Sequence, residues 1–419
     1  MRTVYIADLI LTGAPQESIR NGAVVVNEGK IEQICSVEEI QNLGDGVEIK
    51  EFGEGSTLLP GLIDTHVHLA FDGSADPVER VRSADELERL AIMLKSAREL
   101  LSAGVTTARD LGAPDLLDVR VKKMIDSGLA RGPRMLTVTA PLTVTGGHCW
   151  FFGGECEGVD EVRRRVRQAR REGADAIKIM STGGNMTEGT LPSEPQFTLE
   201  ELIAIVEEAH KYGMKVAAHA HGAEGIRRSL LAGVDTLEHF SFTTADGSMV
   251  EDAELVEQTA EKGTYVCKTI CSGWGHYISE AVPDDQMRTL MDRGVQVVAG
   301  TDAGIDNTPH VDYVYGLEGM AALGMTNDEV LYSATLKAAA SIGIAEETGS
   351  IEEGKSADLI VVQGDPRDDL QVLRNLKAVV AKGEEYVPEF HSETTWNATV
   401  DAPKYVPELT VKEDVISGV

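Results

Sequence analysis

Two histidines in one short segment, His66 and His68 in "DTHVH", are the first residues whose types and spacing point to chemistry. Side chains two residues apart on a strand point to the same face, so the two imidazoles would lie together. Imidazole nitrogen is a common ligand of Zn²⁺ and similar divalent ions. Because a lone histidine on a strand is more often structural, the pair indicates a metal site only if further ligands follow.

Further candidate ligands stand at the ends of later apolar runs. His219 and His221 lie in "AAHAHG", His239 lies in "LEHF" and Asp302 lies in "AGTDAG". Imidazole combined with carboxylate is a donor set that suits Zn²⁺ or a similar divalent ion. Packing alone does not explain this set beside an HxH pair, so the sequence predicts a metal site.

A single lysine, Lys178, interrupts the otherwise apolar segment "GADAIKIMSTGG". Lysine is rarely fully buried without a partner. Removing its ammonium from water costs several kcal/mol or forces its pKa down. Its position therefore requires an explanation beyond strand packing.

The elements that would position these residues repeat along the chain from about residue 85. A helical stretch ends at glycine and a short apolar run follows, as in "TLEELIAIVEEAHKYG" before "MKVAAHA" and "GIRRSLLAG" before "VDTLEHF". Glycine suits a left-handed helix C-cap, and Thr198 with Glu201 suits a capping box. Strands that alternate with amphipathic helices predict βαβ units and a parallel sheet.

Eight such strands favour an α/β fold of the (β/α)8 TIM barrel type. An open doubly wound sheet is the competing hypothesis, but it predicts a glycine-rich phosphate loop after the first strand, and "LIDTHVHLAFDG" has none. Functional side chains of a barrel lie at the carboxyl ends of its strands, where the candidate ligands fall. The strands are expected near residues 58–66, 105–111, 134–140, 175–181, 215–220, 235–240, 264–269 and 295–302.

Both ends of the chain contain short alternating runs typical of β hairpins, such as "AVVVNEGKIEQIC" and "EGKSADLIVVQGD". Their likeness suggests one small β-sandwich-like domain built from both termini. We predict this domain over residues 1–56 plus 353–400, the barrel over 57–352, and a loosely attached tail over 401–419.

The chain is acidic, with a formal charge of −31 and a pI near 4.7. This charge argues against nucleic acid and anionic membranes as partners. We see no signal peptide and no apolar run near the ~18 residues that span a bilayer. The cysteines lack metal-site spacing. We therefore expect a cytoplasmic protein with reduced thiols. A small-molecule substrate and a homo-oligomer are further expectations, which the charge does not decide.

These motifs resemble the amidohydrolase superfamily over nearly the whole chain. "LLPGLIDTHVHL" resembles its strand 1 signature, "GTDAG" its strand 8 aspartate motif, and "GSIEEGKSADLIVV" the tail that returns to its small β domain. "DAIKIMSTGG", "AAHAHG" and "LEHFSF" are similar to a binuclear branch that includes Xaa-Pro and Xaa-Arg/Lys dipeptidases. Imidazolonepropionase, phenylurea hydrolases and ochratoxin-degrading amidases are looser relatives, and the branch does not define the substrate.

The resemblance implies a site for two divalent ions, with Zn²⁺ expected. Three residues would hold the buried ion and two would hold the second: His66, His68 and Asp302, then His219 and His239. Lys178 would bridge the ions as a carboxylated lysine formed with CO₂, which turns the buried cation into an anionic oxygen ligand. The alternative for Lys178 is an ordinary lysine paired with Asp302 or with substrate.

The implied reaction is hydrolysis of a C–N amide bond. The two ions would bridge a water and lower its pKa from about 15.7 toward 7. The hydroxide would attack the carbonyl, and Asp302 would carry the proton to the leaving nitrogen. Dipeptides and N-acyl amino acids are the first expected substrates, and ureas, carbamates and aryl amides are the alternative.

Two further histidines are expected to act in catalysis and to contact substrate. His221 stands where dipeptidases of this branch tend to carry tyrosine, and it could stabilise the tetrahedral oxyanion in its place. His148, in "TVTGGHCWFFGGE", would contact substrate or the oxyanion. The other candidate substrate contacts are Trp150 in an apolar pocket, Arg227 toward a carboxylate, and His310 in a loop after strand 8. Packing or surface solvation is the alternative for these three.

Two other functions stay open. A mononuclear deaminase of the same superfamily often has a glutamate three residues after a strand 5 histidine, as His221 and Glu224 are spaced here. Deaminases generally lack the strand 4 lysine, so one metal per chain with an unmodified Lys178 would favour this function. The other is a non-catalytic binding protein, which any metal-dependent hydrolysis would exclude.

Overall fold

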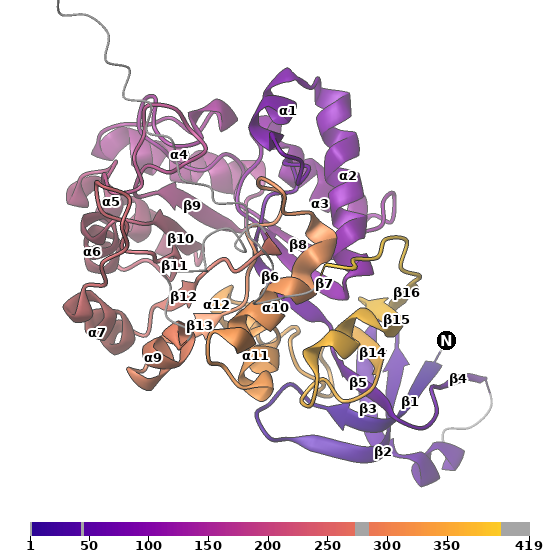
Figure 1. Cartoon of the computed structure of the whole chain (residues 1–419). Helices are drawn as coiled ribbons and strands as arrows, with labels where there is room; N and C mark the ends of the chain where they lie inside the picture. Colours follow the sequence, from indigo (N-terminus) through magenta and orange to yellow (C-terminus); the bar gives the residue numbers. More distant parts are fainter. Residues whose placement is uncertain (1, 43–45, 273–284, 395–419) are drawn as a thin grey trace, which may run out of the picture.

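A computed structural model describes residues 2–42, 46–272 and 285–394 of the 419-residue chain. The tail expected over 401–419, and residues 395–400 of the predicted terminal domain, lie outside this part. Helices and strands alternate along most of the described chain, which confirms the predicted α/β class. In Figure 1 the strands from the two ends of the chain lie together on one side, beside the parallel strands and their helices.

Strands from both ends of the chain form one eight-stranded sheet. Its order is β16-β15-β14-β5-β1-β2-β3, and β4 pairs with β1. Since β5 pairs with both β1 and β14, the N-terminal and C-terminal segments meet within the sheet. Tyr5, Val24 and Leu359 belong to the buried cluster that these strands share. The strands are β1 (Arg2–Leu11), β2 (Ser18–Asn27), β3 (Lys30–Ser36), β4 (Val47–Glu51), β5 (Ser56–Pro60), β14 (Leu359–Gln363), β15 (Leu376–Ala381) and β16 (Glu384–Tyr386).

The first predicted strand, near 58–66, is two strands in the structure. Residues 56–60 form β5 of the terminal sheet, and a new strand begins at Leu62. Gly61 separates the two, and a Cβ at this position would lie 2.0 Å from Thr106 Oγ1. The chain can therefore pass this close to Thr106 only with glycine. Both strands are apolar, so nothing in the local pattern marked the change of pairing partners.

The eight strands expected for a barrel form two parallel sheets. One has the order β6-β7-β8 and the other has the order β13-β12-β11-β10-β9. Apart from the split described above, each strand lies within the range predicted for it. The strands are β6 (Leu62–Val67), β7 (Val105–Asp110), β8 (Arg134–Thr137), β9 (Ala176–Met180), β10 (Lys215–Ala220), β11 (Thr236–His239), β12 (Tyr265–Cys267) and β13 (Gln296–Val298).

Hydrogen bonds connect these two sheets at both of their edges. At one edge, the Asp302 N–H donates to the His66 carbonyl at 2.8 Å. At the other edge, the Leu142 N–H donates to the Lys178 carbonyl at 2.8 Å. The backbones of three candidate ligands are therefore held where the two sheets meet.

Helices follow the parallel strands, and their predicted end signals are present. Gly173, Gly233 and Gly263 end α4, α6 and α7 with left-handed φ values of 109°, 86° and 66°. Thr198 and Glu201 form the predicted capping box of α5. The α-helices are α1 (Pro77–Ser83), α2 (Glu86–Ser102), α3 (Leu117–Asp126), α4 (Val159–Glu172), α5 (Leu199–His210), α6 (Ala223–Ala232), α7 (Ala253–Lys262), α9 (Gln286–Asp292), α10 (Tyr313–Ala322), α11 (Asn327–Ser333) and α12 (Leu336–Ser341). The 3₁₀ turns are η1 (Val37–Asn42), η2 (Pro114–Leu116), η3 (Trp150–Phe152), η5 (His310–Asp312) and η6 (Leu370–Arg374).

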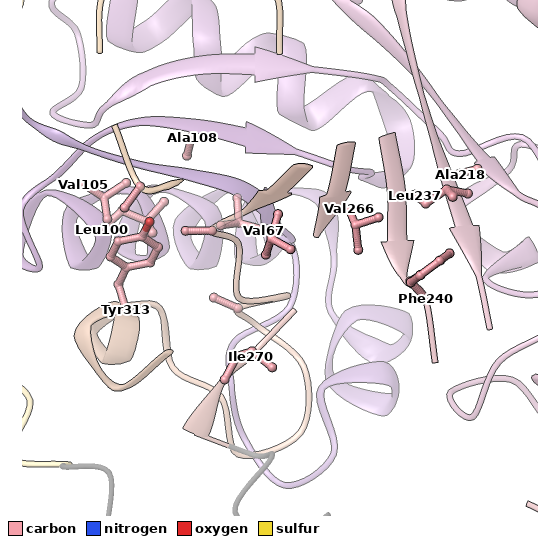
Figure 2. Packing of buried hydrophobic residues seen from close by; sticks show 14 of the residues in the cluster. Val67, Leu100, Val105, Ala108, Ala218, Leu237, Phe240, Val266, Ile270 and Tyr313 are labelled. Carbon is pink, nitrogen blue, oxygen red and sulfur yellow. The ribbon is translucent and has the colours of Figure 1, made fainter. Parts of the chain in front are cut away.

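One hydrophobic core joins the parallel strands to the helices around them (Figure 2). Val67 of β6, Leu237 of β11 and Val266 of β12 all belong to it, and Leu100 contributes from α2. Fully burying a side chain of this kind stabilises the fold by roughly 1.5–3 kcal/mol. This packing holds rigid the strands whose ends carry the candidate ligands.

The five cysteines serve as packing residues in this fold. All five are buried, and no disulfide joins any two of them. Among the helices within the described residues, none is both long enough and apolar enough to cross a bilayer.

Candidate metal centre

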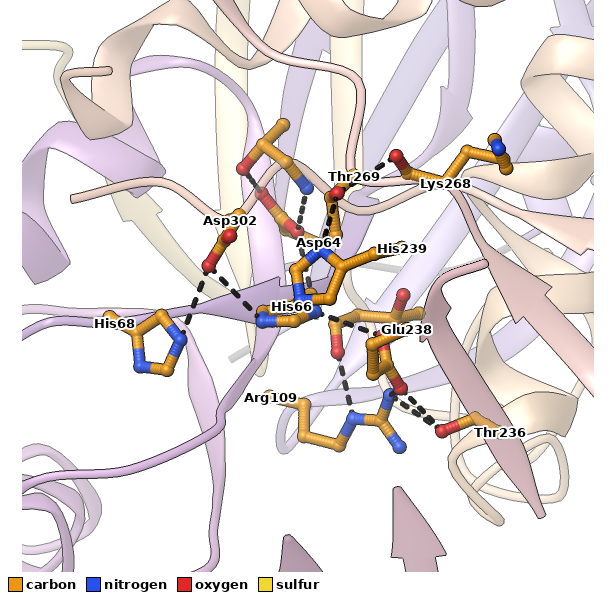
Figure 3. A network of polar contacts seen from close by, with 12 residues as sticks. Asp64, His66, His68, Arg109, Thr236, Glu238, His239, Lys268, Thr269 and Asp302 are labelled. Atoms are coloured by element: carbon orange, nitrogen blue, oxygen red, sulfur yellow. Dashed lines mark hydrogen bonds and ion pairs between the residues drawn. The ribbon is translucent and has the colours of Figure 1, made fainter. Parts of the chain in front are cut away.

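The structure brings the candidate ligands from five strands into one buried cluster. The His66 ring lies 5.3 Å from the ring of His68 and 5.3 Å from that of His239. His219 lies 4.4 Å from His239, measured between ring centroids. Asp302 Oδ1 is 3.2 Å from Nε2 of both His66 and His68 (Figure 3). This proximity would allow these residues to bind metal together, and their role as ligands stays a prediction.

Two sets of these residues have ligand atoms close enough to share an ion. In one set, the atoms of His66, His239 and Asp302 all lie within 4.8 Å of one another. In the other, the same holds for His219, His221 and His239. The second set contains His221, which the sequence assigned to the oxyanion, so a metal-ligand role for His221 is also geometrically possible.

Lys178 is buried in this cluster, with 1% of its surface exposed. Its Nζ has no hydrogen-bond partner among the described residues. Burial lowers the pKa of Lys178, and the charges of Glu238 and Asp302 act in the opposite direction. A charged amine with no acceptor in a closed interior is costly. The residues therefore fit a metal centre in which Lys178 becomes an oxygen ligand, because that change removes the unpaired ammonium.

Burial favours the neutral form of five histidines in this cluster, and metal binding requires that form. Burial lowers the pKa of His148 to about 3 and that of His221 to about 4. Burial also lowers the pKa of His68, His219 and His239. A neutral imidazole keeps a lone pair on one ring nitrogen, and that lone pair can bind a cation.

A buried ion pair that the sequence analysis missed lies directly behind the cluster. Glu238 Oε2 is 2.9 Å from His66 Nδ1, and Glu238 Oε1 accepts a hydrogen bond from Arg109 Nη2 at 2.8 Å. Burial raises the pKa of Glu238, but the Arg109 charge and the His66 contact outweigh it, so the pKa lies well below its usual range. A carboxylate that orients a histidine in this way is typical of metal sites. The only available signal was the position of Glu238 directly before His239.

Hydroxyl groups and a second carboxylate fix other members of the cluster. Thr269 Oγ1 lies 3.0 Å from His239 Nδ1, and Ser241 Oγ lies 2.8 Å from His221 Nδ1. Asp64 accepts hydrogen bonds from the Thr301 hydroxyl at 2.5 Å and from the His66 N–H at 3.1 Å. The Asp64 contacts tie the β6 segment that carries His66 to the segment that carries Asp302.

The backbone is strained where ligands leave their strands. His239 has a φ of 72° and Asp302 a φ of 61°, and Thr269 has a φ of 53°. Residues other than glycine rarely adopt this left-handed region, at a cost of roughly 1–3 kcal/mol each. Such strain persists only where the surrounding structure enforces it, and it clusters at functional sites.

His148 also joins the cluster from the loop after β8. Its ring centroid is 4.6 Å from that of His219, and its backbone N–H donates to Gln196 Oε1 at 2.6 Å. A Cβ at Gly184 would lie 2.5 Å from His148 Nε2, so the loop after β9 packs directly against this ring. The predicted catalytic residues His148, His221 and Asp302 are thus gathered in one place.

Aromatic side chains extend from the cluster toward the surface. Phe71 lies 5.6 Å from His68 and 5.3 Å from Phe152 between ring centroids. Trp150 is 6.3 Å from Phe151 in an edge-on arrangement and is 40% exposed. Ring contacts through Phe151 and Phe71 therefore connect Trp150 to His68 of the cluster.

Of the remaining two predicted substrate contacts, Arg227 forms ion pairs on α6 and His310 lies buried near His68. Arg227 on α6 is ion-paired with Glu224 at 2.9 Å and with Asp252 at 3.5 Å. His310 is fully buried rather than in an open loop, and its Nδ1 is 3.9 Å from Glu99 Oε2. The substrate roles of both residues stay predictions.

The fold and the site define an α/β protein with a site of metal-ligand type at the carboxyl ends of its parallel strands. Residues 57–386 match the model of the amidohydrolase family. The chain belongs to the amidohydrolase family and is a hydrolase, which confirms the resemblance seen in its motifs.

Known proteins that are similar to this chain have several different activities. The ochratoxinase of Aspergillus niger is 30% identical over 429 residues, which cover 90% of this chain and 84% of that protein. An imidazolonepropionase of Mesorhizobium japonicum is 26% identical over 375 residues, covering 82% and 86% respectively. The crystal structure of a Xaa-Pro dipeptidase with methionine bound in its active site has a TM-score of 0.81 and 30% identity, and the match covers 92% of this chain and 100% of that one.

Proposed function

We propose that this chain is a metal-dependent amidohydrolase that cleaves the C–N amide bond of a small molecule, with dipeptides and N-acyl amino acids as its first substrates. The observation that carries the proposal is the convergence of four histidines, Asp302 and the unpaired Lys178 in one buried cluster. The similarity to a Xaa-Pro dipeptidase supports a dipeptide substrate.

The metal ligands follow from the donors in the cluster. His66, His68 and Asp302 would hold one ion, and His219 with His239 would hold the other. Lys178, carboxylated by CO₂, would bridge them. Imidazole and carboxylate donors suit Zn²⁺. When bound, two such ions would supply Lewis acidity toward the scissile carbonyl and lower the pKa of a water to near neutrality.

The chain's own side chains would perform the remaining steps. Asp302 would take the proton of the attacking water and give it to the leaving nitrogen. His148 and His221 would donate N–H hydrogen bonds to the developing oxyanion. Ser241 supports this role, because its contact with His221 Nδ1 leaves the Nε2 of that ring for substrate.

We further infer that the eight parallel strands close into a (β/α)8 barrel. The hydrogen bonds between the two sheets at both edges support closure. Residues 57–352 would then form the catalytic domain, and residues 1–56 with 353–400 the small terminal domain.

The structure does not support the deaminase alternative, which depended on the spacing of His221 and Glu224. Glu224 is 43% exposed and is ion-paired with Arg227 and Arg228. It therefore does not supply the buried carboxylate beside His221 that the spacing suggested. Hydrolysis of ureas, carbamates or aryl amides at the same site stays the main alternative.

The test is a substrate screen of protein loaded with Zn²⁺ in bicarbonate, against dipeptides, N-acyl amino acids, aryl amides and ureas. We expect two equivalents of metal and turnover of a dipeptide or an N-acyl amino acid. Lys178→Met should lose bound metal and activity. Lys268→Met is the matched control, because Lys268 is also buried but its Nζ donates to the Phe240 carbonyl at 2.9 Å. Lack of turnover of every amide in the panel would refute the proposed function.

A further inference from the structure

Arg109 is a completely buried cation whose hydrogen bonds are incomplete. Its Nε donates to the Thr65 carbonyl at 2.7 Å, and its Nη2 donates to Glu238 Oε1 at 2.8 Å and to Thr236 Oγ1 at 3.2 Å. Its Nη1 has no partner among the described residues. Buried polar groups are nearly always paired, and leaving a charged donor unpaired is costly. The orphan Nη1 therefore points to an acceptor that the unmodified side chains do not provide.

Lys178 Nζ is the second orphan donor of the same interior. Arg109 lies close enough to lower the pKa of Lys178, and both groups act on Glu238. Arg109, Lys178 and Glu238 come from β7, β9 and β11, the second, fourth and sixth of the parallel strands. Alternate strands of a parallel barrel contribute side chains to one interior layer, which is consistent with the electrostatic effect of Arg109 and Glu238 on Lys178. Arg109 and Lys178 thus each carry a buried donor without an acceptor among the described residues.

We propose that Arg109 is a positioning residue for a carboxylated Lys178, with Nη1 donating a hydrogen bond to a carbamate oxygen. This inference rests on the proposed function. In the modification, the lone pair of the neutral Nζ forms a bond to the carbon of CO₂. One C–O π pair moves onto oxygen, and one N–H proton leaves to water. The product is an anion, and a guanidinium donor stabilises it by a charge-assisted hydrogen bond.

Glu238 gives this arrangement its rigidity. Its ion pair with Nη2, together with the Nε contact to Thr65, holds the guanidinium plane in one orientation. Because the guanidinium is planar, Nη1 is held in place as well. The same carboxylate contacts His66, so the carbamate and one candidate ligand would be positioned by a single buried network.

The test measures the carbamate directly, by ¹³C NMR of Zn²⁺-loaded protein equilibrated with ¹³C-bicarbonate. Wild type should show a carbamate signal that Lys178→Ala lacks. Arg109→Lys should lower carbamate occupancy at limiting bicarbonate by about tenfold, which corresponds to ~1.4 kcal/mol. Thr236→Val is the matched control, because it removes another contact of the same guanidinium and leaves Nη1 intact.

Folding is controlled with a second variant. Arg109→Met combined with Glu238→Gln removes both charges of the buried pair, and it should also lose carbamate while keeping a cooperative unfolding transition. Unchanged carbamate occupancy in folded Arg109→Lys and in the double variant would overturn the role of Arg109 and leave the proposed function standing. A wild-type protein that binds two metals without any carbamate signal would overturn Lys178 carboxylation and the role of Arg109 together.

Discussion

Glu238→Gln is the most informative single perturbation of this protein. Glu238 is completely buried and has two roles. One of its oxygens pairs with the buried cation Arg109, and the other contacts Nδ1 of the candidate metal ligand His66. Glutamine has almost the same shape but no charge. The substitution therefore removes the charge of the pair while leaving packing nearly unchanged.

The expected loss of stability follows from the burial of the partner. Without the charge of Glu238, Arg109 would remain as an uncompensated buried cation. Removing one member of a buried ion pair costs roughly 3–5 kcal/mol. The loss of an outer carboxylate behind a metal-binding histidine lowers metal affinity by about 10- to 100-fold.

Two assays separate these effects. Urea unfolding of the metal-free protein measures the free energy of unfolding, and chelator competition measures Zn²⁺ affinity. Glu224→Gln is the control, since it breaks exposed ion pairs with Arg227 and Arg228 and should cost ~0–1 kcal/mol. Equal unfolding free energies for Glu238→Gln and wild type would refute the buried-pair argument. Unchanged Zn²⁺ affinity would remove Glu238 from the metal centre.

Two further predictions concern pH and the loop after β9. Burial raises the pKa of Asp118 from 3.8 to about 6. Its protonated form therefore stabilises the fold below the ordinary value, and this contribution is lost as the pH rises through about 6. Asp118→Asn should accordingly gain stability relative to wild type as the pH rises from about 4 to about 6 in urea unfolding, and a difference independent of pH would contradict the raised pKa. Gly184→Ala would place a Cβ 2.5 Å from His148 Nε2. It should lower kcat/KM by about 10- to 100-fold with metal content intact, and an unchanged kcat/KM would remove His148 from the reaction.

Much of the architecture could be predicted because its signals are local. Glycine after each amphipathic helix and the Thr198–Glu201 box depend on neighbouring residues, and the structure contains both. The short apolar strands were recognisable for the same reason. The boundary at Gly61 was not, because β5 and β6 are equally apolar and differ only in the strands that they pair with.

The features of the candidate site also fall into two groups, those set by a single segment and those set by tertiary packing. The types of the ligands and their places at strand ends were readable, since HxH spacing and strand-end positions are properties of single segments. The burial of His310 and the surface pairing of Arg227 were not, because both depend on which side of an element faces its neighbours.

The sequence by itself determined the family of this protein, the order of its strands and helices, and the residues that could bind metal. Only the tertiary structure decided what supports them. Arg109 and Glu238 are 129 positions apart, and His66 and Glu238 are 172 apart, yet they form one buried network. No local pattern encodes such a network, since Arg109 and Glu238 read as ordinary charged residues until the strands converge and exclude water around them.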